Sequence, residues 1–209
     1  MEDRLILYRK QQQRRQEYKE VAAKSCYSVI IVVAALIVLR PLMVDQILSR
    51  ADAYSAGGFL DESRRQCDKA LLIDDDSSPA WCQLARIYKA QGDREMAYGA
   101  YEEAVQADGA NLAAQFELGM MYMDDGRHQL AIPHLVRVRS LGPNHKTSGD
   151  RSGGNSYHRA SLYMLVLCYE KVGDPTKTEM TLKEIRVFYP DCGNPEDHLA
   201  PLRPNPLPR

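Results

Sequence analysis

The aromatic and small residues of this chain recur at a fixed spacing of 34 residues. In each unit a tyrosine is followed four residues later by a glycine, and small residues recur before and after this pair. The equivalent positions are Tyr54, Tyr88 and Tyr122; Gly58, Gly92 and Gly126; Ala51, Ala85 and Gly119; Ser63, Ala97 and Ala131; and Ala70, Ala104 and Val138. Apolar residues fall at helical spacing around each glycine, so the pattern predicts two helices joined by a tight turn in every unit.

The unit Ser78–Asn111 shows this pattern most clearly. Its first predicted helix begins near Ser78, which is a good N-cap, and Pro79 suits the first helical position. Ala85 in the first helix and Ala97 in the second are small, so the two helices can lie close together.

With this spacing and these residue types, the chain resembles the tetratricopeptide repeat (TPR) family over residues 44–192. The pattern is interrupted after the third unit and resumes 47 residues on, where Tyr169 and Gly173 take the places of Tyr122 and Gly126. The resemblance implies an all-α fold in which about four helix-turn-helix units stack into an α-solenoid, with a curved inner face that holds another polypeptide. The predicted units are 44–77, 78–111, 112–145 and 159–192, with a polar, Gly- and Ser-rich insertion at 146–158 that we expect to be flexible.

The end of the chain is rich in proline, with six prolines among residues 190–209. Because proline lacks an amide donor and breaks helices, we expect an extended tail over residues 193–209 and no capping helix after the last repeat. The tail itself or a partner would then cover the end of the array.

An uncharged stretch precedes the repeats. Residues 27–39 contain no charged side chain, and apolar residues extend this stretch on both sides. Lys24 and Arg40 would lie about 24 Å apart along a helix, so their cationic ends could reach the head groups of a bilayer. We therefore expect a transmembrane signal anchor over residues 25–43. A buried helix of a soluble protein and a cleaved signal peptide are the alternatives.

The charges around this stretch predict its orientation. Residues 1–24 hold seven Lys or Arg and four acidic residues, whereas only Arg40 and Arg50 follow the stretch closely. The positive-inside rule then predicts a basic cytoplasmic head over residues 1–24 and a TPR array on the periplasmic or another extracytoplasmic side. The five cysteines lack paired spacing, which indicates mostly free thiols and leaves a Cys67–Cys82 bridge open.

The resemblance to TPR proteins also implies which side chains line the groove, because the inner sides of the first helices face it. The predicted partner-binding residues are Gln83, Arg86 and Lys89 in the second unit, Phe116, Glu117, Met120 and Met123 in the third, and Tyr163, Met164 and Leu167 in the fourth. The first end would be basic and the far end apolar, which suits an apolar helix or an extended segment as partner. The alternative is that Phe116, Met120 and Met164 belong to the core between repeats.

Composition and motifs limit the chemistry. The formal net charge of −1 gives no global electrostatic argument for binding nucleic acid. No catalytic pairing, metal-ligand spacing or phosphate-binding loop can be placed on these helices, so we expect no catalytic residue, metal or cofactor. His145 and His158 flank the predicted insertion and are interpreted as surface histidines.

Together these observations favour a noncatalytic, membrane-anchored adaptor or scaffold that binds a protein or peptide segment in its concave groove. The layout resembles bacterial inner-membrane proteins with a cytoplasmic head, one span and periplasmic TPR units, which suggests a role in assembly or export of envelope proteins. The alternative is a stoichiometric structural subunit of a multiprotein membrane complex.

Overall fold

The computed structural model describes residues 19, 27, 30, 33–35, 39–144, 154–192 and 194–199. The chain divides into two compact units, Met1–Val44 and Asp45–Arg209, which are described separately. The described residues of the first unit are helical. No helix among the residues described is long and apolar enough to cross a membrane. The predicted anchor 25–43 is described only in part, because residues 25, 26, 28, 29, 31, 32 and 36–38 lie outside the described residues, as does nearly all of the predicted head 1–24.

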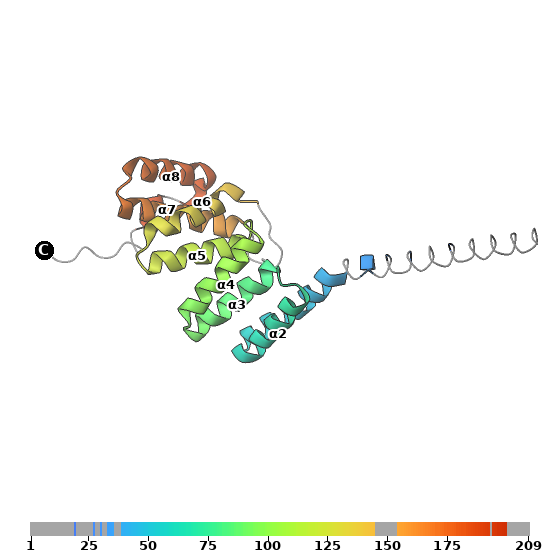
Figure 1. The fold of residues 1–209 in the computed structure, drawn as a ribbon. Helices are drawn as coiled ribbons and strands as arrows, with labels where there is room; N and C mark the ends of the chain where they lie inside the picture. Colours follow the sequence, from blue (N-terminus) through green and yellow to red (C-terminus); the bar gives the residue numbers. More distant parts are fainter. Residues whose placement is uncertain are drawn as a thin grey trace, which may run out of the picture. The chain divides into compact units, whose positions relative to one another are not determined.

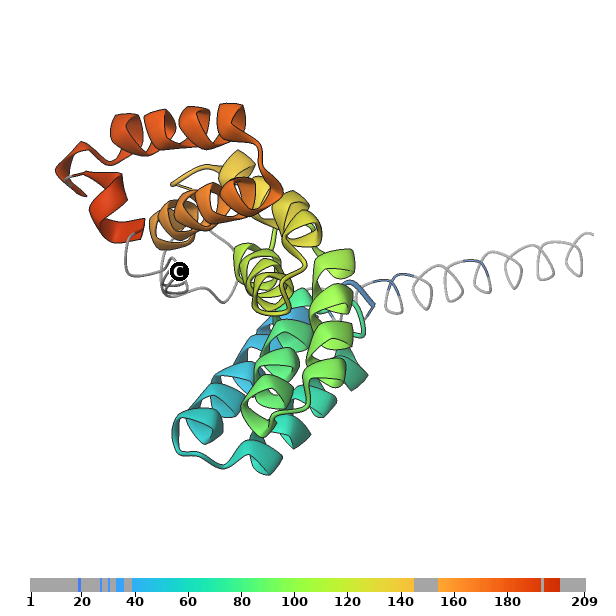
Figure 2. The same ribbon diagram turned by 90° about the vertical axis from the view of Figure 1, so that its left-hand side faces the viewer.

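The second unit consists of helices that pack as consecutive hairpins (Figure 1; Figure 2). Residues 45–56 are helical and precede α2 (Leu60–Ile73). The following helices are α3 (Ser78–Gln91), α4 (Arg94–Ala107), α5 (Leu112–Asp124), α6 (His128–Leu141), α7 (Gly154–Val172), α8 (Pro175–Phe188), the short 3-10 helix η1 (Pro190–Cys192) and α9 (Pro195–Leu199). Each helix from α2 to α8 packs on the next, and α5 also packs on α7. This arrangement confirms the predicted all-α solenoid.

Each hairpin turns at one of the recurring glycines. Gly92 has a φ of 83°, a left-handed conformation that favours glycine. Its amide donates to the carbonyl of Lys89 at 3.1 Å, and the amide of Asp93 donates to the carbonyl of Tyr88 at 2.9 Å. These two bonds form a Schellman motif that satisfies the last carbonyls of α3. The carbonyls of Tyr54, Tyr122 and Tyr169 accept the equivalent bond at 2.8–2.9 Å, so the recurring Tyr-to-Gly spacing reflects a recurring helix end.

The start of α3 differs from the prediction. The N-cap is Ser77, whose side chain makes no capping hydrogen bond, and Ser78 is already helical. The Ser78 hydroxyl instead donates to the carbonyl of Ala104 at 2.7 Å and accepts from Asn111 Nδ2 at 2.8 Å. Asn111 in turn caps α5, because its Oδ1 accepts from the amide of Ala114 at 3.1 Å. This buried polar chain ties one hairpin to the next.

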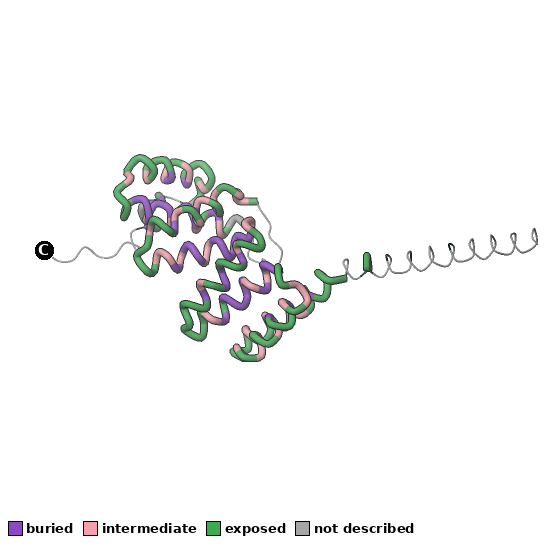
Figure 3. Tube along the Cα trace, in the orientation of Figure 1, coloured by how far each residue is buried: buried purple, intermediate pink, exposed green. Residues whose placement is uncertain are grey.

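Small residues let the two helices of a hairpin pack closely. Ala85 on α3 and Ala97 on α4 are both fully buried. At Gly119 on α5 an added Cβ would lie 3.1 Å from the side chain of Leu135 on α6, which leaves little room for any larger residue. Buried positions concentrate on α3, α5 and α7, whereas α8 is largely exposed (Figure 3). The core therefore forms where the two helices of each hairpin pack closely together.

The last part of the chain corrects two predictions. Helix α7 begins at Gly154, so the last five residues of the predicted insertion 146–158 are helical, and residues 146–153 lie outside the described residues. The predicted extended tail 193–209 contains α9, and Leu199 is fully buried against Leu162, Tyr163, Val166 and Ile185. Proline starts this helix at Pro195, where its missing amide is not needed. A short helix therefore covers part of the last hairpin.

Replacing Gly92 with alanine tests the turn. Gly92→Ala should destabilise the protein by about 1–2 kcal/mol, because a side chain disfavours the left-handed conformation. Gly99 provides the matched control, since it lies within α4 and a Cβ there meets nothing within 4 Å. Gly99→Ala should stabilise by about 0.5–1 kcal/mol. Far-ultraviolet circular dichroism of the full chain in detergent would measure both, and a Gly92→Ala variant as stable as the wild type would contradict this account of the turn.

Candidate partner-binding surface

The ten predicted groove residues lie on α3, α5 and α7, and we call them the inner surface. Arg86 and Lys89 on α3 are exposed. Six residues on α5 and α7 are half-buried, namely Phe116, Glu117, Met120, Met123, Met164 and Leu167. Gln83 and Tyr163 are each only 8% exposed, so they cannot offer a partner much area. The prediction that Gln83 and Tyr163 line an open groove is therefore corrected.

The basic end of the inner surface is partly neutralised. Lys89 Nζ lies 2.7 Å from Glu117 Oε2, an ion pair that joins α3 to α5. The Lys89 and Glu117 side chains are 45% and 25% exposed, so solvent weakens this pair, and its effect on stability is small. The sequence predicted that Lys89 would be available to a partner, but its charge is already matched within the protein.

Arg86 makes a different contact. Its Nη2 lies 3.5 Å from the hydroxyl of Tyr157, which comes from the first turns of α7. The Tyr157 ring also lies against Phe116, with 5.5 Å between the ring centroids. Tyr157 falls within the predicted flexible insertion, so the sequence analysis did not include it in the surface. Its helical position brings it onto residues of α3 and α5 that are distant in sequence.

A buried hydroxyl lies in the core cluster on which Tyr157 packs. Tyr101 on α4 is fully buried, and its hydroxyl has no hydrogen-bond partner among the described residues. Burial raises the pKa of Tyr101, and the nearby Glu117 carboxylate raises it further. Burial also lowers the pKa of the Arg86 guanidinium, but the adjacent Cys82, Tyr157, Tyr101 and Glu117 outweigh it and raise the pKa overall. The Arg86 side chain is nevertheless exposed.

The apolar end of the inner surface is shared with the core. Phe116, Met123 and Met164 pack against the buried cluster that includes Leu135 and Leu165. Leu167 packs against a second cluster, which contains Leu199 of α9. Tyr163 belongs to the same cluster, and its ring lies edge-on to His198 with 5.8 Å between centroids. These side chains therefore support the repeats as well as bordering the inner surface.

Two histidines, His145 and His158, were predicted to lie at the surface, and the structure describes only the second. His145 lies outside the described residues. His158 is only 1% exposed, and its Nδ1 lies 2.7 Å from the hydroxyl of Tyr189. Burial, aided by the positive charge of Arg139, lowers the pKa of His158. The interpretation of His158 as a surface residue is therefore wrong. His158, Leu162 and Val166 are spaced four residues apart and so share one helix face, and this spacing could have indicated that His158 is buried with the two apolar residues.

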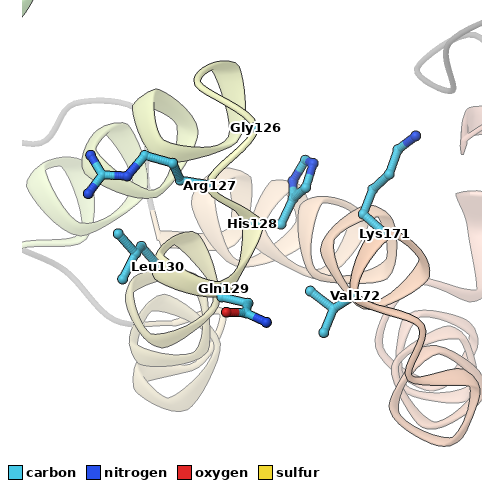
Figure 4. A pocket seen from close by; sticks show the side chains of 7 residues that line it. All are labelled: Gly126, Arg127, His128, Gln129, Leu130, Lys171 and Val172. Carbon is cyan, nitrogen blue, oxygen red and sulfur yellow. The ribbon is translucent and has the colours of Figure 1, made fainter.

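A separate cavity of about 450 Å³ lies where the α5–α6 turn meets the end of α7. Its lining contains no predicted groove residue and consists of Gly126, Arg127, His128, Gln129, Leu130, Lys171 and Val172. Figure 4 shows that Arg127 and Lys171 point away from each other, so the basic side chains do not converge on one ligand. Within the described part of the chain, no group of three His, Cys, Asp or Glu side chains could hold a metal ion. Cys67 and Cys168 are buried free thiols, and Cys82 is buried as well.

Comparison with protein families matches residues 78–111, the hairpin of α3 and α4, to the family model of the tetratricopeptide repeat. Comparison with curated protein sequences gave no match.

Several solved structures share the fold. A Pseudomonas aeruginosa pilF structure is 18% identical, with a TM-score of 0.61, over 78% of this chain and 68% of that one. The MamA protein is 18% identical, with a TM-score of 0.54, over 80% of this chain and 81% of that one. The Yersinia enterocolitica type III secretion chaperone SycD, solved with a peptide of the translocator YopD, is 16% identical, with a TM-score of 0.52, over 62% and 94%. The chain is thus similar to these proteins in fold, an all-α solenoid of TPR-like repeats in which Ser78–Asn111 matches the tetratricopeptide repeat itself.

Proposed function

We propose that this protein is a noncatalytic adaptor that holds a client polypeptide on its inner surface. The proposal rests on the kinds of side chain that the inner surface presents on α5 and α7. Its methionine, leucine and phenylalanine side chains are half-buried, and Tyr157 contacts both Phe116 and the exposed Arg86. Flexible thioether side chains adapt to different apolar partners, and an exposed cation can set the direction of a bound chain.

The comparisons support a polypeptide as the ligand. The structure of SycD, which shares this fold, contains a peptide of the translocator YopD. Repeat arrays of this kind present an extended concave surface because each repeat is rotated slightly relative to the one before it. A peptide that runs across α3, α5 and α7 would contact three consecutive hairpins of this chain.

The proposal includes a membrane anchor at residues 25–43, a cytoplasmic head at 1–24 and the repeat array on the opposite side of the membrane. Its support is the uncharged stretch 27–39 and the excess of basic residues before it. In this position the array would hold its client beside the bilayer, which suits the assembly or export of envelope proteins.

A second candidate is a stoichiometric subunit of a membrane complex. It is favoured by α8, the last long helix, which leaves Met180 and Val187 exposed by 65% and 76%. A permanent neighbour would cover such side chains. Purification in mild detergent separates the candidates, because a subunit retains partners in fixed stoichiometry and an adaptor is recovered largely without them.

Photo-crosslinking in native membranes tests the adaptor. A photoreactive amino acid at Met120, on the inner surface, should yield a client adduct in the membrane fraction, and one at Glu103, exposed on α4, should not. Equal adducts from the two positions would contradict binding at the inner surface.

Extraction with alkaline carbonate tests the anchor. The full chain should resist this extraction, whereas a chain without residues 1–43 should be released. Release of the full chain would contradict the anchor.

Serine substitutions separate binding from folding. Phe116→Ser should cost about 2 kcal/mol of stability, because Phe116 packs on Tyr157 and on a buried cluster. Met120→Ser should cost less than about 1 kcal/mol, since Met120 is half-buried and outside the described core clusters, yet it should reduce the client adduct. Thermal unfolding and the adduct yield would be measured together. Equal destabilisation by the two variants would assign Met120 to the core instead.

A further inference from the structure

We infer, and this step rests on the proposed function, that α9 occupies in the free protein the position in which a helix of the client binds. The client helix is amphipathic and carries a leucine, which takes the place of Leu199. The binding site is the face of α7 and α8 on which Leu199 now packs, and it adjoins the inner surface at Tyr163. The client therefore binds by replacing a segment of the protein itself.

Leu199 keeps the period of the repeats. Leucines recur on the first helices of the second, third and fourth units, at Leu84, Leu118 and Leu165, with spacings of 34 and 47 residues. Leu199 follows 34 residues after the last of these. All four leucines are at most 4% exposed. In sequence, α9 therefore takes the place of the first helix of a fifth repeat.

The packing of α9 agrees with this register. Leu118 on α5 belongs to the buried cluster of the α3–α4 hairpin, and Leu165 on α7 belongs to the cluster that contains Leu135 of α6. In the same way Leu199 packs on the hairpin before it, against Leu162, Tyr163, Val166 and Ile185. Helix α9 contacts both α7 and α8, as α7 contacts both α5 and α6. The site is therefore shaped for the first helix of a repeat.

Helix α9 is much shorter than the helix that this position can hold. It has five residues, whereas α5 has 13 and α7 has 19. Pro195 and Leu199 lie four residues apart on one face and are buried, whereas Asp197 and His198 are exposed. Helices this short have little stability of their own, so α9 depends on the docking of its buried side chains. A longer client helix would bury the same leucine and cover more of α7 and α8.

Replacement of α9 would also enlarge the inner surface. Tyr163 is 8% exposed, and the ring of His198 lies edge-on to its ring with 5.8 Å between centroids. Leu167 packs on the same cluster as Leu199. When α9 leaves, Tyr163 and Leu167 become accessible to the client. The site is thus continuous with the apolar part of the inner surface, and one client segment can contact both.

Peptide binding to the full-length protein in detergent tests this exchange by fluorescence anisotropy. The probe is a synthetic helix of about 15 residues that begins with the α9 sequence, Pro195–Leu199, and continues with alanine, glutamate and lysine. Leu199→Asp in the protein should strengthen binding of this peptide about tenfold or more, because aspartate does not enter an apolar site and α9 no longer competes. Asp197→Ala, on the exposed side of α9, should leave binding unchanged. A peptide with its leucine changed to aspartate should bind neither the wild type nor the variants.

The client adduct in native membranes gives a second readout. With the photoreactive amino acid at Met120, Leu199→Asp should raise the adduct yield about twofold or more, because the client no longer has to displace α9. A purely structural role of α9 predicts the opposite sign, since the loss of Leu199 would loosen the last hairpin and lower the yield. Leu199→Ala removes fewer atoms and should shift both readouts in the same direction to a smaller extent. This milder variant keeps the test decisive if the aspartate variant folds poorly.

The remaining outcomes separate this site from the adaptor function. Equal binding of the peptide to the wild type and to both Leu199 variants would overturn the exchange and leave the adaptor function standing. Peptide binding without any client adduct would contradict the proposed function and, with it, the client as the occupant. A wild type that dimerises, with a Leu199→Asp variant that stays monomeric, would assign the site to α9 of a second copy and would also overturn the client as its occupant.

Discussion

The close approach of the two helices in each hairpin is the constraint on which the rest of the structure depends. Ala85 and Ala97 are fully buried where α3 meets α4, and Gly119 has no room for a side chain where α5 meets Leu135. Only small residues at these positions allow the larger neighbours to interlock at the density of a protein interior. Trp81 and Tyr88 then pack on two core clusters at once, so each hairpin stabilises the next.

The inner surface follows from this packing. Because consecutive hairpins stack in register, the first helices α3, α5 and α7 present equivalent positions along one side. Contacts with neighbouring helices then reduce the part of this surface that a partner can reach. Lys89 is matched by Glu117 on the neighbouring helix, and α9 covers Tyr163, so the area left to a partner is narrower than the repeat pattern alone implies. What remains is a half-buried apolar region beside an arginine that lacks an ionic partner in the described structure.

The features that the sequence predicts are those determined by neighbours along the chain. The tyrosine and glycine of each turn are four residues apart, so their spacing alone predicts the helix ends that the backbone hydrogen bonds confirm. The features that it misses depend on residues far apart in sequence. Tyr157 contacts Arg86 and Phe116 from within a stretch predicted to be flexible, and Ser78 bonds the carbonyl of Ala104 rather than capping its own helix. A local pattern carries no information about such partners.

The most direct test of this account replaces a small residue in the hairpin contact with a large one. Ala97→Leu should destabilise the protein by about 1–3 kcal/mol, because the added atoms force α3 and α4 apart. It should also abolish capture of the client on the inner surface. Ala107→Leu, at an exposed position of the same helix, should change neither property. Thermal unfolding and client crosslinking of the two variants would be measured side by side. An Ala97→Leu variant as stable and as active in binding as the wild type would contradict the claim that close helix packing builds the surface.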